Sequence, residues 1–196
     1  MMDNSFAMND GISEIRRSCC LELRKIADIR SYLSVEATNK LVCAFVTSKL
    51  DYCNSLVTGI SESEIAKLQQ VQNNAAKLVY GKKRSGRATP LLKELHWLPV
   101  RQRIECGAAS IVFQCLSLPN CPTCLSAVFA PYTPTRTLGS EGRNLLAKPG
   151  AGLETCGDRA FAFRGPDVWN RLPLSVQQSE PLSGFESVLK TCLFKN

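Results

Sequence analysis

Apolar residues recur every three or four positions through much of the N-terminal half of the chain. Between residues 12 and 31 this spacing is kept by Ile12, Ile15, Cys19, Leu23, Ile26 and Ile29. A period of about 3.6 residues places such side chains on one face of an α-helix. The pattern therefore predicts an amphipathic helix over 12–31. A second helix is predicted over about 35–57, because Ser34 is placed to cap its first turn and Gly59 follows its last apolar residue.

A third helix is predicted over about 61–79, and both of its ends carry signals. Ser61 and Glu64 have the spacing of a capping box, in which each side chain bonds to the other residue's backbone N–H group. Gly81 follows the last apolar position, where a helix often ends on a glycine. After a basic loop, a short helix is predicted to reach Leu95, with Thr89 as its cap and Pro90 as its first residue.

A longer helix is predicted from Pro99 to about Leu118, and the apolar period then loosens. Residues 144–148 and 153–156 are candidates for a small β-hairpin, short helical pieces are expected on either side of Gly165-Pro166, and a last helix begins near Ser183. The prediction is a mainly α fold with a small irregular C-terminal part, the short β-hairpin being an open alternative. Residues 1–118 would form a helical region and residues 119–196 a Pro- and Gly-rich connector with a helical extension.

The composition is that of an ordinary globular protein, with 44% hydrophobic and 21% charged residues among 196. The uncharged run 106–135 is solidly apolar only as far as Leu118, which is short of the roughly 20 residues that a membrane span needs. No signal peptide is visible, and we interpret the ten cysteines as thiols of a reducing compartment. We therefore expect an intracellular protein, nuclear or cytoplasmic, without a membrane partner.

Positive charge is concentrated in residues 77–103, here called the basic stretch. It holds eight of the 24 lysines and arginines and one of the 17 acids, so the rest of the chain is neutral and the net charge of +7 resides here. Such a concentration predicts a polyanionic partner, RNA or DNA. The alternative is a solvated loop whose charge only keeps the protein soluble. The candidate phosphate contacts are Lys82, Lys83, Arg84, Arg87, Lys93, Arg101 and Arg103.

Two further features bear on this interface. Arg101 and Arg103 lie near the start of a predicted helix, whose free N–H groups favour anions. The rings of Tyr80, His96 and Trp97 are candidates for stacking on bases. For Trp97 we favour a core position, because Leu95 and Leu98 flank it, and we interpret His96 as a packing residue beside it.

The sequence contains little of what catalysis requires. His96 is the single histidine, so neither a Ser-His-Asp site nor a metal site built on several histidines is expected. There is no adjacent pair of aspartates for a two-metal centre, and no Gly-rich phosphate loop. We expect no enzymatic activity and no cofactor.

Cys121 and Cys124 form the single CxxC motif that resembles a metal site. A structural zinc ion needs about four ligands, usually from two such pairs, and no second pair follows. A redox role would require a thioredoxin-like context, which is missing. We favour two incidental loop thiols, with zinc and redox roles as the alternatives.

Several sequence blocks occur in a fixed order along nearly the whole chain. They are LDYCNSL at 50–56, IAKLQQVQNNAAKLV at 65–79, TP at 89–90, LKELHWLPVRQRI at 92–104, PYTPTR at 131–136, PDVWNRLP at 166–173 and FESVLKTCLF at 185–194. Together they resemble the region that follows the reverse-transcriptase domain in polyproteins of LINE-type, jockey-like non-LTR retrotransposons.

The resemblance implies thumb-like helices with a C-terminal extension, and no catalytic residues, because the family's polymerase carboxylates and endonuclease belong to other parts of the polyprotein. It implies a non-catalytic role in gripping RNA or DNA through the basic stretch. The alternative is a scaffold fragment that packs against the reverse-transcriptase catalytic domain and binds no nucleic acid itself.

Overall fold

The computed structural model describes residues 4–52, 61–82, 86–117, 128–132, 144–148, 161–179 and 181–195. These residues are mostly helical and contain no β-sheet, so the predicted mainly α fold is confirmed. They belong to two compact units, Met1–Arg103 and Ile104–Asn196. No helix among the described residues is both long enough and apolar enough to span a bilayer.

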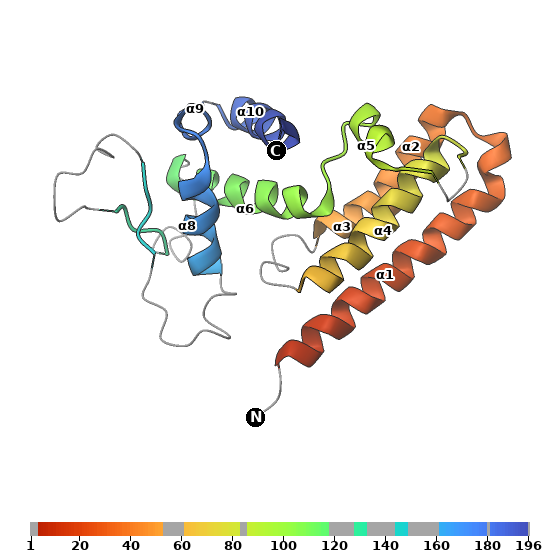
Figure 1. Cartoon of the computed structure of the whole chain (residues 1–196), viewed down its shortest axis with the longest axis horizontal. Helices are drawn as coiled ribbons and strands as arrows, with labels where there is room; N and C mark the ends of the chain where they lie inside the picture. The colour runs from red at the N-terminus through yellow and green to blue at the C-terminus, as the bar shows by residue number, and fades with distance from the viewer. Residues whose placement is uncertain are drawn as a thin grey trace. The chain divides into compact units, whose positions relative to one another are not determined.

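The first unit is built from helices that pack around α4 (Glu62–Val79). Its elements before α4 are α1 (Asn4–Ile29), a 3₁₀ turn (Arg30–Tyr32), α2 (Val35–Val42), a π-helical turn (Cys43–Thr47) and α3 (Ser48–Tyr52). After α4 come α5 (Thr89–Glu94) and the first residues of α6 (Val100–Ser117). Figure 1 shows α4 beside α1, and the segment from α2 to α3 packs against both of these helices.

Much of the apolar period predicted from the sequence forms the core of this unit. The buried residues of α1 are Ile12, Cys19, Leu23 and Ile26, whereas Ile15 is half-buried and Ile29 is 46% exposed. The buried apolar residues of α4 are Leu68, Val71, Ala75, Ala76 and Val79. Val42, Val46 and Leu50 complete the core. The first helix begins earlier than predicted, at Asn4, and the second contains a π-helical turn that the pattern does not reveal. Residues 53–57 of the second predicted helix lie outside the described part.

Predicted helix ends are mostly confirmed. The Ser34 Oγ accepts a hydrogen bond from the Ala37 N–H at 3.1 Å, and the Ser61 Oγ accepts one from the Glu64 N–H at 3.4 Å. Only this serine half of the capping box is seen among the described residues; the Glu64 carboxylate instead accepts a hydrogen bond from Lys67 Nζ at 2.6 Å, through Oε1. The cap of α5 is Ala88 and not the predicted Thr89, whose side chain makes no capping bond.

Gly81 ends α4 with a left-handed φ of 62°. The Gly81 N–H donates to the Leu78 carbonyl at 3.0 Å, and the Lys82 N–H donates to the Lys77 carbonyl at 2.9 Å. These two bonds define a Schellman motif, which satisfies carbonyls that the helix end leaves unpaired. The prediction that Gly81 ends this helix is confirmed.

The second unit contains the rest of α6 together with α8 (Phe161–Arg171), α9 (Leu174–Gln177) and α10 (Leu182–Lys195). Its core is aromatic: Phe113 of α6 stacks on Phe185 of α10, with ring centroids 4.2 Å apart, and Trp169 of α8 lies 6.1 Å from Phe185. Figure 1 shows α8 crossing the second half of α6. The two units divide between Arg103 and Ile104, within α6, and Val112 and Phe113 of this helix are buried in the second unit.

Residues 144–148 pair with 130–132 through an antiparallel bridge between Pro131 and Leu146. The partner strand predicted for them, 153–156, lies outside the described residues, so the β-hairpin stays a prediction. The Asn170 amide fixes this pairing by bonding both the N–H and the carbonyl of Leu146 at 2.9 Å.

One prediction for this unit is corrected: α8 continues through Gly165 and Pro166, where the sequence predicts two helical pieces. A Cβ on Gly165 would lie only 2.8 Å from the Phe129 ring. The glycine therefore serves close packing of the helix against Phe129 and does not break it. The last helix, α10, begins at Leu182, one residue before the predicted start.

Candidate nucleic-acid interface

The basic stretch runs through the end of α4, the following loop, α5 and the start of α6, all within the first unit. Lys82 follows the Schellman motif, Arg87 precedes α5 and Lys93 lies in the last turn of α5. These three residues are exposed, and none of them forms an ion pair with an acid in the described part of the chain. They are therefore accessible to a polyanion. Lys83 and Arg84 lie outside the described residues.

Arg101 and Arg103 are engaged by acids that come from outside the basic stretch. Arg101 forms an ion pair with Glu62 at the start of α4. The Arg103 Nη1 donates to both carboxylate oxygens of Asp51, at 2.7 and 2.9 Å, and its Nε donates to the Leu98 carbonyl at 3.0 Å. These two arginines therefore hold α6 against α3 and α4 within the unit, and their positive charges are largely compensated.

The start of α6 is held by amide side chains of α4. The Val100 N–H donates to the Gln69 Oε1 at 2.8 Å, and the Gln72 Nε2 donates to the Leu98 carbonyl, also at 2.8 Å. The Gln69 Nε2 donates in turn to Gln72 and Asn73, which fixes the orientation of its amide. The sequence predicts that free N–H groups at the start of this helix attract an anion beside Arg101 and Arg103. One of these groups, the Val100 N–H, is already hydrogen-bonded to Gln69.

His96 and Trp97 occupy opposite environments because of how α5 ends. His96 has a left-handed φ of 54°. Its N–H donates to the Lys93 carbonyl at 3.1 Å, while the Trp97 N–H donates to the Leu92 carbonyl at 2.8 Å. This is a second Schellman motif, with the hydrophobic contact of such motifs supplied by the buried Trp97 and Leu92.

The rings that were candidates for base stacking are therefore unequal. Trp97 is 5% exposed, which confirms its predicted core position and removes it from the surface. His96 is exposed, so the interpretation of it as a packing residue is wrong. Tyr80 is half-buried; this burial raises the pKa of its phenol, and a hydrogen bond with Glu94 raises it further.

One cation contact was missed entirely at the level of sequence. Arg30, in the 3₁₀ turn directly after α1, donates from Nε to the Leu78 carbonyl at 3.0 Å and from Nη2 to the Val79 carbonyl at 2.8 Å. Its Nη1 donates to the Leu33 carbonyl at 2.7 Å. A positive charge at a helix C-terminus interacts favourably with the helix dipole. Arg30 therefore stabilises the end of α4, from which the basic loop starts.

Among the described residues, no group of three or more His, Cys, Asp or Glu side chains could hold a metal ion. Cys121 and Cys124 lie outside these residues, so the expectation that they bind no zinc remains a prediction. Comparison of the chain with models of protein families, with curated proteins and with solved structures found no match.

Proposed function

We propose that this chain is a non-catalytic part of a retrotransposon reverse-transcriptase polyprotein and that it binds the phosphate backbone of RNA or DNA. The observation that carries the proposal is the exposure of Lys82, Arg87 and Lys93 on one continuous segment, without acidic partners in the described residues. The remainder of the chain outside the basic stretch has no net charge. A polyanion would therefore be attracted to this segment in preference to the rest of the surface.

The expected binding is weakly specific for sequence, because phosphate contacts position a nucleic acid without reading its bases. If about five phosphates are neutralised on duplex DNA, the affinity should fall roughly 10²–10³-fold between about 50 and 200 mM salt, because bound counterions are released. Fluorescence anisotropy with labelled RNA and DNA at several salt concentrations measures this slope.

The decisive variant replaces Lys82, Lys83, Arg84 and Arg87 with alanine and should flatten the salt dependence. The matched control replaces the same number of charges at Arg16, Arg17, Lys25 and Lys40, which belong to α1 and α2 and not to the basic stretch. Lys25 and Lys40 already pair with Glu22 and Glu36. Equal affinities and equal slopes for wild type and the loop variant would contradict the proposal.

The proposal includes the absence of catalysis by this chain. It is supported by the single histidine and by the lack of paired aspartates in the sequence. Primer-extension and DNA-nicking assays with Mg²⁺ or Mn²⁺ should therefore be blank. Activity that copurifies with the chain and disappears when one of its acids is replaced would contradict this part of the proposal.

A second candidate function is docking on the catalytic domain of the same polyprotein. It is favoured by Tyr52, which is 81% exposed and lines a shallow groove between α1 and α3 together with Ile15. An exposed aromatic side chain beside an apolar one is typical of interface cores. The salt titration separates the two functions, because a docking scaffold would show no affinity for RNA or DNA at low salt.

A further inference from the structure

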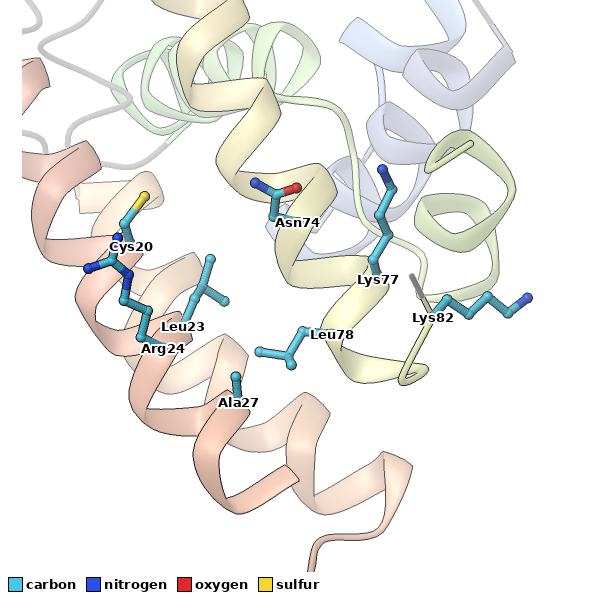
Figure 2. Close-up of a pocket in the computed structure, with 8 residues that line it drawn as sticks. All are labelled: Cys20, Leu23, Arg24, Ala27, Asn74, Lys77, Leu78 and Lys82. Atoms are coloured by element: carbon cyan, nitrogen blue, oxygen red, sulfur yellow. The ribbon is translucent and has the colours of Figure 1, made fainter. Parts of the chain in front are cut away.

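A groove of about 300 Å³ lies between α1 and α4 in the first unit, where the basic stretch begins. Its apolar lining comes from Leu23 and Ala27 of α1 and from Leu78 of α4. Figure 2 shows these three side chains between the two helices. Asn74, one turn before Leu78, adds a neutral amide that can both donate and accept hydrogen bonds.

The groove is bordered by three cations and lined by no acid: the cations are Arg24 of α1, Lys77 of α4 and Lys82 after α4. Arg24 and Lys82 form no ion pair within the described part of the chain. In Figure 2 the side chain of Lys82 extends away from α1. Lys82 thus belongs both to the edge of the groove and to the exposed cations that continue with Arg87 and Lys93.

A groove that combines apolar side chains with bordering cations matches the chemistry of an unpaired nucleotide, which joins a base with apolar faces to a charged phosphate. In a duplex those faces are covered by stacking, whereas an unstacked base can enter a pocket and exclude water from its faces. The volume lies at the lower end of the range of about 300–1,000 Å³ for small-ligand pockets, which suits a single base.

We propose that the groove receives one unstacked nucleotide of a single-stranded RNA or DNA segment, with its base against Leu23, Ala27 and Leu78. The flanking phosphates would lie near Arg24 and Lys77, and the strand would continue over Lys82. This inference rests on the proposed function and adds to it a preference for single strands. A duplex, held only by phosphate contacts, would bind more weakly at the same salt concentration.

The test compares labelled single-stranded RNA, single-stranded DNA and a blunt duplex of equal length by anisotropy, with wild type and Ala27→Phe. Ala27 is exposed, so a phenylalanine there should fill the groove without disturbing the core. Wild type should prefer single strands about tenfold, the order of magnitude expected for one accommodated base. Ala27→Phe should lose this preference and keep its affinity for the duplex.

Ala66→Phe is the matched control, because Ala66 is also an exposed alanine of a helix but does not line the groove. Arg24→Gln provides a second variant on an exposed position of α1 and should weaken single-strand binding with no loss of stability. Thermal unfolding followed by circular dichroism checks that all variants are folded.

The outcomes separate this inference from the proposed function. Equal binding of single strands and duplex by wild type, unchanged by Ala27→Phe, would overturn the nucleotide groove and leave phosphate binding intact. Absence of any binding at low salt would overturn both. If adenosine monophosphate competed as strongly as a single-stranded oligonucleotide, the groove would be a site for free nucleotides, and the strand proposal would be overturned.

Discussion

Gly81 and His96 occupy the same position in two Schellman motifs, one ending α4 and the other ending α5. Both have a left-handed φ, of 62° and 54°. Glycine adopts this conformation without a steric penalty, whereas a residue with a Cβ carries a cost of roughly 1–2 kcal/mol. Histidine is nevertheless among the residues enriched there. The fold thus tolerates a strained residue at 96 and avoids one at 81.

This comparison predicts opposite effects for two substitutions. Gly81→Ala should lower the free energy of unfolding by about 1 kcal/mol, and His96→Gly should raise it by up to about 1 kcal/mol, because only the first introduces a Cβ at positive φ. Chemical denaturation at neutral pH measures both changes. The same sign for the two substitutions would show that the left-handed conformation does not govern the stability of these helix ends.

Asp167 is the carboxylate with the most cationic neighbours among the described residues. Lys148 and Arg171 lie 2.6 and 2.7 Å from its oxygens, and Arg164 lies at 4.0 Å. Burial raises the pKa of Asp167, but the hydrogen bond from Lys148 and the three positive charges outweigh it, so the pKa lies below its usual value of 3.8. Folding therefore favours the ionised carboxylate.

The stabilisation by Asp167 should be complete above pH 4 or so and should be lost as the pH falls from about 3.9 through the lower pKa of the folded state. Asp167→Asn should lower the free energy of unfolding at pH 7 by about 1 kcal/mol, a modest amount because its partners are exposed. The difference from wild type should shrink toward pH 3. Glu36→Gln, on an exposed pair of α2, is the control and should have little effect at either pH.

Most residue-level features whose partners are close along the chain were predictable from the sequence, the cap of α5 at Thr89 being an exception. The caps Ser34, Ser61 and Gly81 act on residues only a few positions away, and these predictions were right. His96 was misread because its exposure depends on the backbone conformation at the end of α5, which no apolar pattern encodes. The contact of Arg30 with Leu78 and Val79 joins residues far apart in sequence, so local spacing gave no sign of it.

At the scale of the elements, α4 organises the first unit because residues of other elements bond to both of its ends and to the glutamines along its length. Its C-terminal carbonyls accept hydrogen bonds from Arg30, and Gln69 and Gln72 hold the connection between α5 and α6. The glutamines stood out in the sequence only as part of a family-like block. Their role depends on the start of α6 lying beside them in the fold, and the spacing of apolar residues does not predict that contact.

Arg30 should be important for stability because it joins the end of α1 to the end of α4. Arg30→Ala should lower the free energy of unfolding by about 2 kcal/mol, since it removes several charge-assisted bonds to carbonyls in a partly buried site. Arg30→Lys should recover only part of this loss, because an ammonium group lacks the planar fork that reaches Leu78, Val79 and Leu33 together.

Arg17→Ala is the matched control for Arg30, since Arg17 is exposed on α1, the preceding helix, and makes no hydrogen bond or ion pair within the described part of the chain. It should leave the denaturation midpoint nearly unchanged. A loss of stability in the control as large as that of Arg30→Ala would mean that the cost comes from charge alone and not from capping α4.

At the scale of the whole molecule, the fold compensates part of the positive charge that the sequence concentrates in the basic stretch, by pairing it with distant acids. The composition correctly located the excess of positive residues, but it could not show which of them meet acids from distant segments. Arg101 meets Glu62 and Arg103 meets Asp51, and each of these pairs spans more than thirty residues of sequence. The candidate interface is therefore smaller than the basic stretch and is centred on its first part.

Substitutions at Arg87 and Arg101 test whether ion pairing removes a cation from the interface. Both are exposed arginines of the basic stretch, but of the two only Arg101 is paired with an acid from another segment, Glu62. Arg87→Gln should reduce the magnitude of the salt slope on duplex DNA by about 0.9, the contribution of one released counterion. Arg101→Gln should change the slope much less, because its charge is already compensated within the protein. Anisotropy titrations of both variants at four or more salt concentrations measure the two slopes. If the two variants lost the same slope, nucleic acid would have displaced Glu62 from Arg101, and the interface would extend to the start of α6.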